Sequence, residues 1–184
     1  ISSHSADPSL EGMRLDDIAR RKLQDPLDTA IDILIQGGAG IVSFNMNEKD
    51  VELLMQQPWM MTSSDGALVR FGEGAEHPRA YGAYPRKLRR YVIERQVVSM
   101  AQAIHSSSGL PAQVFAIPDR GVLRPGAFAD VLVFNPETVR DVATYPKPHA
   151  YSEGMDFVFV NGKAALLEGQ VTAERHGRVI LRND

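Results

Sequence analysis

Two side chains of this chain are suited to catalysis by their type and position, and the first is Asp65. It lies in Ser64-Asp65-Gly66, where an apolar run ends and a polar loop begins. In α/β barrels the reacting groups project from this C-terminal end of the strands. A carboxylate there can bind a metal ion through oxygen and can accept a proton from water that the metal makes acidic. Asp65 is therefore our candidate catalytic residue and metal ligand, although an isolated SDG tripeptide is more often a simple turn.

The second side chain is Arg79, which lies in His77-Pro78-Arg79 within the polar loop that follows. A guanidinium can hold a carboxylate through two parallel hydrogen bonds, which fix its orientation as well as adding binding energy. Arg79 is therefore a candidate for binding a substrate carboxylate. On spacing alone, an exposed arginine in a surface loop is the commoner explanation.

The other residue types that bind metals are scattered or absent. The five histidines form no HxH or HxxxH pair, and each alone is more often structural than a ligand. The chain has no cysteine, which excludes a disulfide framework, a cysteine nucleophile and a thiolate ligand within it. The sequence therefore contains no self-contained metal site.

Charge and hydrophobicity argue against two classes of partner. Lys and Arg number 20 against 23 Asp and Glu, so nothing favours a nucleic-acid surface. We interpret a short basic run, Arg86, Lys87, Arg89 and Arg90, as the solvated face of a helix. No apolar run approaches the roughly 20 residues that cross a bilayer. With no cysteine as well, we expect a cytoplasmic protein that binds neither nucleic acid nor membrane.

The apolar periodicity of residues 1–116 predicts helices that alternate with strands. The expected helices are 15–24, 26–36 and 47–57, and the expected strands are 40–44 and 59–63. Residues 67–85 are expected to be a long polar loop, and 86–116 to be helical in two or three pieces. This alternation is typical of a parallel α/β sheet or barrel.

The pattern changes after Pro118, where short β-rich runs are separated by turns. Strands are expected within 129–134, 157–160 and 163–167, and Asn161-Gly162 is the strongest hairpin signal in the sequence. We therefore expect two domains, residues 1–116 with α/β character and residues 117–184 with a small antiparallel β region.

Several segments, taken together and in order, resemble one enzyme family. They are PWMMTSSDG (58–66), HPRAYG (77–82), YPR and RYV (84–92), GLPA (109–112), DRG and RPGAFADV (119–131), DVATY (141–145) and VNG (160–162). The family is that of D-aminoacylases and related N-acyl-D-amino-acid deacylases, in the amidohydrolase superfamily. The chain resembles its C-terminal portion. RPGxxAD marks amidohydrolases broadly, whereas the HPR, ATY and VNG motifs together are far more specific.

The resemblance implies the fold, the reaction and the roles of three residues. The fold would be the last βα units of a metal-dependent (β/α)8 barrel, followed by the C-terminal strands of a small β-sandwich. The reaction would be zinc-dependent hydrolysis of the amide bond of an N-acyl-D-amino acid. Asp65 falls on the family's catalytic aspartate and Arg79 on the arginine that holds the substrate carboxylate. Ser3, or its neighbour Ser2, would place a hydroxyl in the same carboxylate site.

The chain also departs from the family pattern. The family's HxH, its thiolate ligand and its two later barrel histidines have no counterparts here, and a (β/α)8 barrel typically needs about 250 residues. The chain also begins without Met. We therefore expect an N-terminal part of the same polypeptide to carry most of the zinc ligands, and the isolated chain to be inactive.

Two alternatives to the deacylase remain. One is another amidohydrolase chemistry, such as the ring opening performed by hydantoinases and dihydropyrimidinases. The spacing of SDG and HPR argues against it, because an arginine that grips a carboxylate suits an acyl amino acid better. The other is a non-catalytic fragment that lacks the metal site, which the absent ligands favour for the isolated chain.

Overall fold

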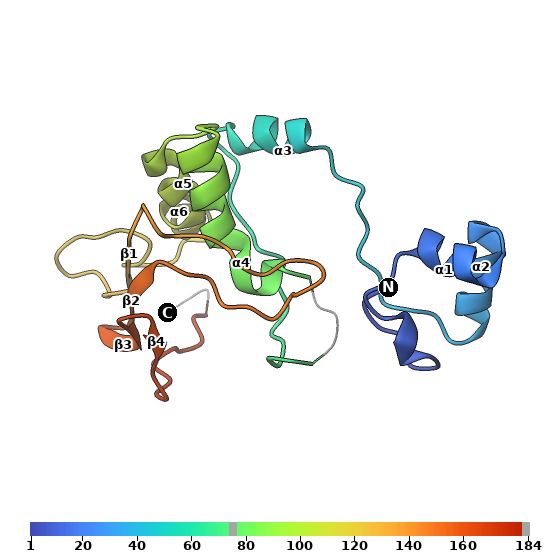
Figure 1. The fold of residues 1–184 in the computed structure, drawn as a ribbon. Coiled ribbons are helices and arrows are strands. Elements are labelled where there is room, and N and C mark those ends of the chain that lie inside the picture. The colour runs from blue at the N-terminus through green and yellow to red at the C-terminus, as the bar shows by residue number, and fades with distance from the viewer. Residues whose placement is uncertain (74–76, 182–184) are drawn as a thin grey trace. The chain divides into compact units, whose positions relative to one another are not determined.

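The structure is a computed structural model that describes residues 1–73 and 77–181, and it combines helices with a small antiparallel sheet (Figure 1). The chain divides into two compact units that alternate along the sequence. The first comprises Ile1–Asn45, Asp65–Tyr81 and Ala143–Ala150, and the second comprises Met46–Ser64, Gly82–Val142 and Tyr151–Asp184. Residues 74–76 of the expected polar loop lie outside the described residues.

The first unit contains three short helices, η1 (Pro8–Leu10), α1 (Leu15–Lys22) and α2 (Pro26–Ile35). The Asp25 side chain accepts a hydrogen bond of 2.7 Å from the Leu27 N–H, so it caps α2 with Pro26 in the first turn. Leu10, Ile18 and Ile33 form the buried core of these helices. The predictions of helices at 15–24 and 26–36 are confirmed.

Most helices of the second unit follow one another between residues 82 and 114. The elements are α3 (Glu48–Met55), α4 (Arg79–Arg86, which begins in the first unit), the π-helical segment η2 (Lys87–Glu94), α5 (Met100–Ser107) and α6 (Gly109–Val114). The Asn47 side chain caps α3 as predicted. The core of this unit is formed by Leu88 of η2, Ala103 of α5, Val98 between these two helices, and Val139.

Two predictions about the region around α4 are wrong. The polar loop was expected to reach residue 85, because an interior proline removes a helical donor and usually ends a helix. The structure instead places Pro85 inside α4, and the chain continues directly into the wider π-helical turns of η2. Lys87 was expected on a solvated helix face, but its side chain is buried.

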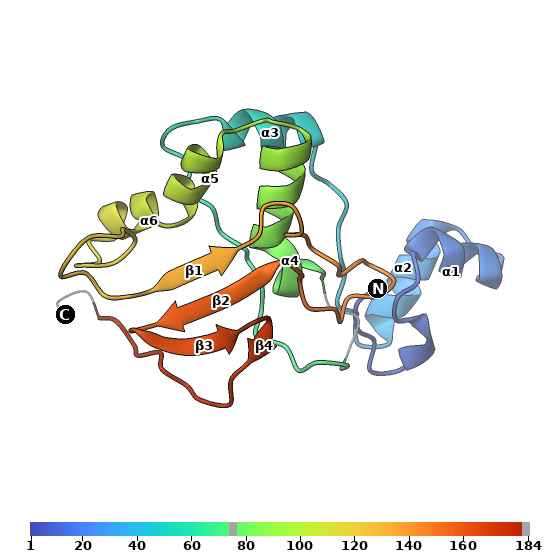
Figure 2. The same cartoon turned by 60° about the vertical axis from the view of Figure 1, so that its left-hand side comes forward.

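The sheet of the second unit is built from consecutive antiparallel strands. They are β1 (Val131–Phe134), β2 (Met155–Val160), β3 (Lys163–Leu167) and β4 (Gln170–Val171), in the order β1-β2-β3-β4 (Figure 2). Asn161 and Gly162 both have positive φ, 52° and 79°, and Val160 pairs with Lys163 across them. These values identify the two-residue turn predicted from Asn161-Gly162, so the hairpin is confirmed.

The strands expected at 40–44 and 59–63 are not formed. Gly40 makes an isolated bridge with Ser3, and the Thr62 N–H donates to the Ser106 carbonyl oxygen at 2.8 Å. A strand requires a continuous hydrogen-bonded neighbour, and apolar composition alone does not supply one. Within the described residues, these segments are irregular chain outside any sheet, and Trp59 lies in a turn.

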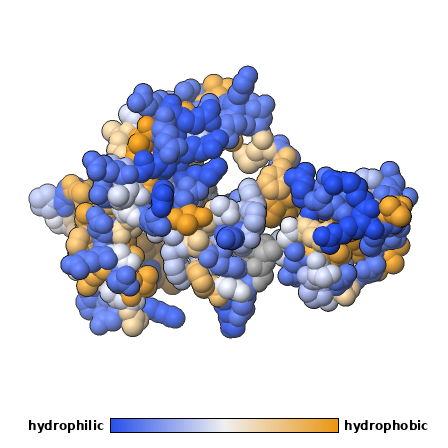
Figure 3. Space-filling view, in the orientation of Figure 1, coloured by the Kyte–Doolittle hydropathy of each residue, from blue (hydrophilic) through white to orange (hydrophobic). Residues whose placement is uncertain are grey.

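Apolar side chains are exposed in both units, and they alternate with polar ones over the face drawn in Figure 3. Four of them lie on one helix, α2: Leu27, Ile31, Leu34 and Ile35, which are 45–79% exposed. Among the described residues, no helix is long and apolar enough to cross a membrane.

Candidate functional site

The structure brings the two predicted site residues, Asp65 and Arg79, into direct contact. Asp65 Oδ2 lies 2.9 Å from Arg79 Nη2, and both residues belong to the first unit. Asp65 has φ of 47°, in the left-handed region that Asp tolerates better than most residues. Its side chain is 81% exposed and that of Arg79 43%, so both groups face water as well as each other. Solvent therefore reaches both members of the ion pair.

His77 forms a hydrogen bond with the backbone of Arg79. Its Nδ1 accepts a hydrogen bond of 3.0 Å from the Arg79 N–H, and its Nε2 lies 3.2 Å from the Tyr145 hydroxyl. Burial lowers the pKa of His77, and the positive charge of Arg79 acts in the same direction while Asp65 opposes it. A neutral His77 that accepts at Nδ1 carries its proton on Nε2, which then donates to Tyr145.

A group of aromatic side chains lies in the same unit and is called the aromatic cluster here. Its members are Phe71, Tyr81 and His149. The Tyr81 hydroxyl and His149 Nδ1 are 3.0 Å apart, and the Phe71 ring meets both of the other rings edge-on, with centroids 5.8–5.9 Å apart. Edge-to-face contacts at this distance are favourable. The cluster therefore joins the segment after Asp65 to the segment 143–150.

Sequence reasoning did not assign roles to His77, Tyr145 or the aromatic cluster. The signal was present, because His77 and Tyr81 lie in the HPRAYG segment and Tyr145 ends DVATY. Of the residues in these two motifs, only Arg79 was predicted to belong to the site. The contacts show a physical reason for the two motifs to occur together.

Ser3, the predicted second contact for a substrate carboxylate, lies in the isolated bridge with Gly40. Its hydroxyl covers the Gly40 backbone so closely that a Cβ at Gly40 would lie 2.5 Å from Ser3 Oγ. The residue is exposed and belongs to the first unit, as Asp65 and Arg79 do.

The described residues do not form a complete metal centre. Among them, no group of three or more His, Asp or Glu side chains converges in a way that could hold an ion. His4 is buried, with Nδ1 accepting from the Asp7 N–H at 2.8 Å, and so it serves the packing of the N-terminal segment. Asp65 could supply one oxygen ligand, and further ligands would have to come from elsewhere.

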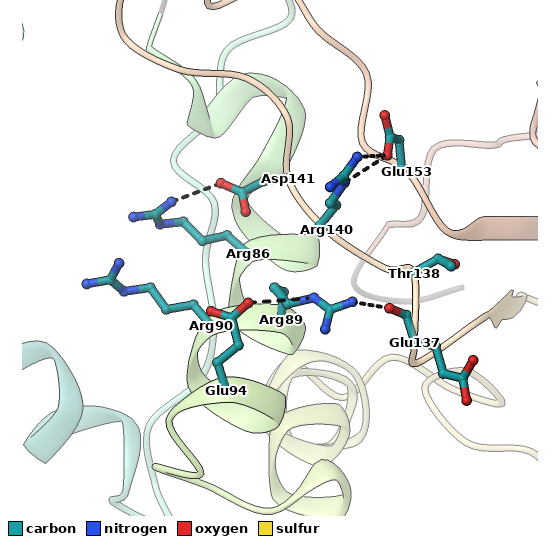
Figure 4. A pocket seen from close by; sticks show the side chains of 9 residues that line it. All are labelled: Arg86, Arg89, Arg90, Glu94, Glu137, Thr138, Arg140, Asp141 and Glu153. Carbon is teal, nitrogen blue, oxygen red and sulfur yellow. Dashed lines mark hydrogen bonds and ion pairs between the residues drawn. The ribbon is translucent and has the colours of Figure 1, made fainter.

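A hollow of about 550 Å³ in the second unit is a separate candidate for a binding site (Figure 4). It is rich in arginine, but the guanidinium groups already form ion pairs or hydrogen bonds within the protein. Arg86 pairs with Asp141, Arg90 with Glu48 and Arg140 with Glu153, while Arg89 donates to the carbonyl oxygens of Glu137 and Val139. We therefore interpret the hollow as a structural network of ion pairs.

Comparisons with known proteins agree with the sequence resemblance. The sequence profile described as "Amidohydrolase family" matches residues 7–166. N-acyl-D-glutamate deacylase from Alcaligenes xylosoxydans xylosoxydans is 36% identical over 96% of this chain, and D-aminoacylase from the same organism is 33% identical over 95% of it.

Solved structures give the same result. The N-acyl-D-glutamate deacylase of Bordetella bronchiseptica, complexed with zinc and a phosphonate mimic of the tetrahedral intermediate, has a TM-score of 0.86 and 38% identity. The match covers 97% of this chain and 36% of that one. The chain spans about 35% of the length of the two curated relatives. The predicted resemblance to D-aminoacylases and related deacylases is confirmed.

Proposed function

The chain belongs to the amidohydrolase family, and from this membership we propose that it is part of a zinc-dependent enzyme that hydrolyses N-acyl-D-amino acids. The products would be a carboxylic acid and a free D-amino acid. The relatives that support this proposal are deacylases whose substrates are N-acylated D-amino acids, and one of them was solved with zinc. The longer polypeptide that the proposal requires is called the complete protein below.

The observation that carries the proposal is the ion pair between Asp65 and Arg79. An acyl amino acid presents a scissile amide and an α-carboxylate close together. An enzyme that cleaves it needs a group that moves protons beside the amide and a cation that holds the carboxylate. Asp65 and Arg79 meet at 2.9 Å and both are exposed to solvent, so one small substrate can reach both. When substrate binds, its carboxylate would replace Asp65 on the Arg79 guanidinium.

The role we propose for Asp65 is proton transfer in both halves of the reaction. It accepts a proton from the attacking water, whose oxygen bonds to the acyl carbon. It then passes this proton to the amide nitrogen as the carbon–nitrogen bond breaks. Zinc, when bound, makes a coordinated water acidic enough to lose a proton near neutral pH. Asp65 also fits the role of one zinc ligand by its carboxylate chemistry, but the described residues alone do not complete the metal site.

The proposed roles of Arg79 and Ser3 concern binding. Arg79 would hold the substrate α-carboxylate through two hydrogen bonds, with His77 accepting from its backbone N–H and steadying the start of α4. Ser3 would add a hydroxyl donor to the same carboxylate. The side chain of the D-amino acid is left for experiment, because the relatives include enzymes named for D-glutamate and for D-amino acids in general.

The architecture we propose is a barrel segment followed by part of a sandwich. Residues 1–116 would contribute the last βα units of a (β/α)8 barrel, and residues 117–184 the C-terminal strands of a small β-sandwich. The segments 40–44 and 59–63 would become barrel strands when partner strands of the complete protein lie beside them. The exposed apolar face of α2 supports this idea, since a contiguous apolar face on a folded protein usually marks a contact surface.

The decisive experiment compares substrates and one variant. The zinc-loaded complete protein is assayed with N-acetyl-D-glutamate, N-acetyl-D-aspartate and N-acetyl-D-methionine, and with the L-enantiomer of each as the control. We expect release of the free amino acid from the D-enantiomers and essentially no hydrolysis of the L-enantiomers. Asp65→Asn should lower kcat by roughly 10²–10⁴-fold while most of the bound zinc remains. Near-normal turnover in that variant would remove Asp65 from the mechanism, and preference for a cyclic imide would favour the ring-opening alternative.

A further inference from the structure

The residue that caps the start of α4 is unusual for its position. His77 Nδ1 accepts from the Arg79 N–H at 3.0 Å, two residues along the chain, as the side chain of an N-cap residue does. Arg79 is the first residue of α4, so its N–H has no carbonyl partner within the helix. Serine, threonine, aspartate, asparagine and glycine are the residues that usually fill this role. What distinguishes histidine from all of them is a second ring nitrogen at its far end.

The second ring nitrogen of His77 contacts Tyr145. Because Nδ1 accepts a hydrogen bond, the imidazole is neutral and carries its proton on Nε2, which lies 3.2 Å from the Tyr145 hydroxyl oxygen. The two rings also meet edge-on, with their centroids 5.1 Å apart. His77 therefore joins the backbone of Arg79 at one end to the side chain of Tyr145 at the other.

Tyr145 is itself restrained by its turn and by a neighbouring ring. It lies with Pro146 in a tight turn whose flanking residues, Thr144 and Lys147, exchange both backbone hydrogen bonds, at 3.0 and 3.1 Å. A residue before proline is restricted to extended backbone, which removes much of the conformational freedom of Tyr145. The Phe44 ring packs edge-on against the Tyr145 ring, with their centroids 4.7 Å apart. The Tyr145 side chain therefore has a defined place within the first unit.

We propose that Tyr145 is a positioning residue for the binding of the substrate carboxylate, because it orients His77 and, through His77, the backbone from which Arg79 projects. This inference rests on the proposed role of Arg79. All three residues belong to the first unit. Tyr145 takes no part in bond making, and its effect reaches the substrate only through Arg79. A guanidinium that holds a carboxylate by two hydrogen bonds depends on its angle as well as its position, so a loosened backbone weakens binding.

The test uses the zinc-loaded complete protein and separates KM from kcat. Tyr145→Phe removes only the hydroxyl and keeps the ring that packs against Phe44. We expect KM for the N-acetyl-D-amino acid to rise by roughly 3–10-fold, the worth of one ordinary hydrogen bond, with kcat little changed. A purely structural role would instead lower the fraction of folded enzyme, which reduces kcat and leaves KM unchanged.

Tyr84→Phe is the matched control and should leave both constants unchanged. Tyr84 is 42% exposed against 46% for Tyr145, and among the described residues its hydroxyl makes no hydrogen bond.

His77 provides a second set of variants. His77→Asn keeps a side chain that can accept from the Arg79 N–H but loses the contact with Tyr145, so its KM should match that of Tyr145→Phe. His77→Ala loses both contacts and should raise KM further. The double variant His77→Asn/Tyr145→Phe should have the same KM as His77→Asn alone, because the two residues act as one unit. Additive increases in KM, or a wild-type KM in Tyr145→Phe, would overturn the proposal.

One measurement does not depend on turnover and separates this inference from the proposed function. Amide hydrogen exchange at Arg79 reports on the hydrogen bond from its N–H to His77. The exchange should become faster in Tyr145→Phe and fastest in His77→Ala, but should not change in Tyr84→Phe. If the wild type fails to hydrolyse N-acyl-D-amino acids, the proposed function is wrong, and the exchange rates still decide whether Tyr145 and His77 hold Arg79. Unchanged exchange in Tyr145→Phe would overturn the inference even in an active enzyme.

Discussion

The strands β1–β4 and the two segments 40–44 and 59–63 have similar apolar sequences, but only the strands form a sheet. The sheet forms between consecutive strands, and two-residue turns with positive φ connect β2 to β3 and β3 to β4. The segments 40–44 and 59–63 are irregular chain outside any sheet within the described residues. Composition makes all of them strand-like, but only the strands of the sheet pair with the next strand along the chain.

The two regions differ in whether nearby or distant residues determine their strands. A hairpin is specified locally, because Asn161-Gly162 favours the one backbone geometry that returns the chain alongside itself. A strand of a parallel barrel is specified by neighbours that are distant in sequence. In the barrel that we propose, Asp65 follows a strand of the second kind, so the residue with the strongest claim to catalysis would depend on contacts that local sequence does not provide.

The largest expected effect concerns hydrogen exchange in these two regions. The amides of β2 should be protected similarly in the isolated 184-residue chain and in the complete protein. The amides of 41–44 should exchange at least ~10³-fold more slowly in the complete protein, because new partner strands would supply their acceptors. Exchange measured by mass spectrometry on both samples tests this, and β2 is the internal control. Equal rates at 41–44 in both samples would contradict the proposed barrel.

The same contrast explains how much could be predicted from the sequence. The hairpin at Asn161-Gly162 and the capped helices α2 and α3 were predicted because turn and cap chemistry is local. Asp65 and Arg79 were found because each lies in a short motif with an evident chemical use. Lys87 was misjudged because a run of basic residues in sequence is typical of a solvated helix face, whereas the burial of Lys87 is created by Thr62 and α5, which lie 16 or more positions away.

A second prediction uses the response of the two regions to pH. The sheet depends on backbone geometry, whereas the segment before Asp65 is tied to Lys87, whose pKa burial lowers to about 8. The unfolded chain keeps the ordinary lysine pKa, so between about pH 8 and pH 10.5 it binds more protons than the folded chain. The free energy of unfolding therefore rises with pH across this window, by up to about 3 kcal/mol, and this group contributes no slope below it.

Urea unfolding of the wild type and of Lys87→Met at several pH values between about 7.5 and 10 measures this effect. The variant should lack the rise and should be at least as stable as the wild type at the lower end. Parallel pH dependence in the two proteins would show that Lys87 is already neutral, or that its ammonium is well solvated.

A smaller effect is expected at the substrate clamp. Arg79→Lys keeps the charge but loses the two-pronged geometry, so we expect KM to rise by roughly tenfold while kcat changes much less. Arg70→Lys is the matched control, because Arg70 belongs to the same unit, is 85% exposed and has a distant ion-pair partner at 3.8 Å. Steady-state kinetics of the complete protein provides the measurement. An unchanged KM in Arg79→Lys would end the clamp hypothesis and leave the ion pair with Asp65 as a structural contact.

The smallest expected effect is a loss of stability from a substitution in the β2–β3 turn of the sheet. Gly162 has φ of 79°, and a Cβ there would meet only the Ala129 side chain, at an ordinary 3.9 Å. Gly162→Ala should therefore lower the free energy of unfolding by about 1 kcal/mol, through backbone strain and not through a clash. Gly177→Ala is the control, since a Cβ at Gly177 meets nothing within 4 Å and its φ lies outside the left-handed region. Because the hairpin forms from adjacent sequence, the strain should lower stability and leave KM and kcat unchanged. A loss of activity at unchanged stability would mean that the sheet positions the site directly, and the separation between the two regions would then be wrong.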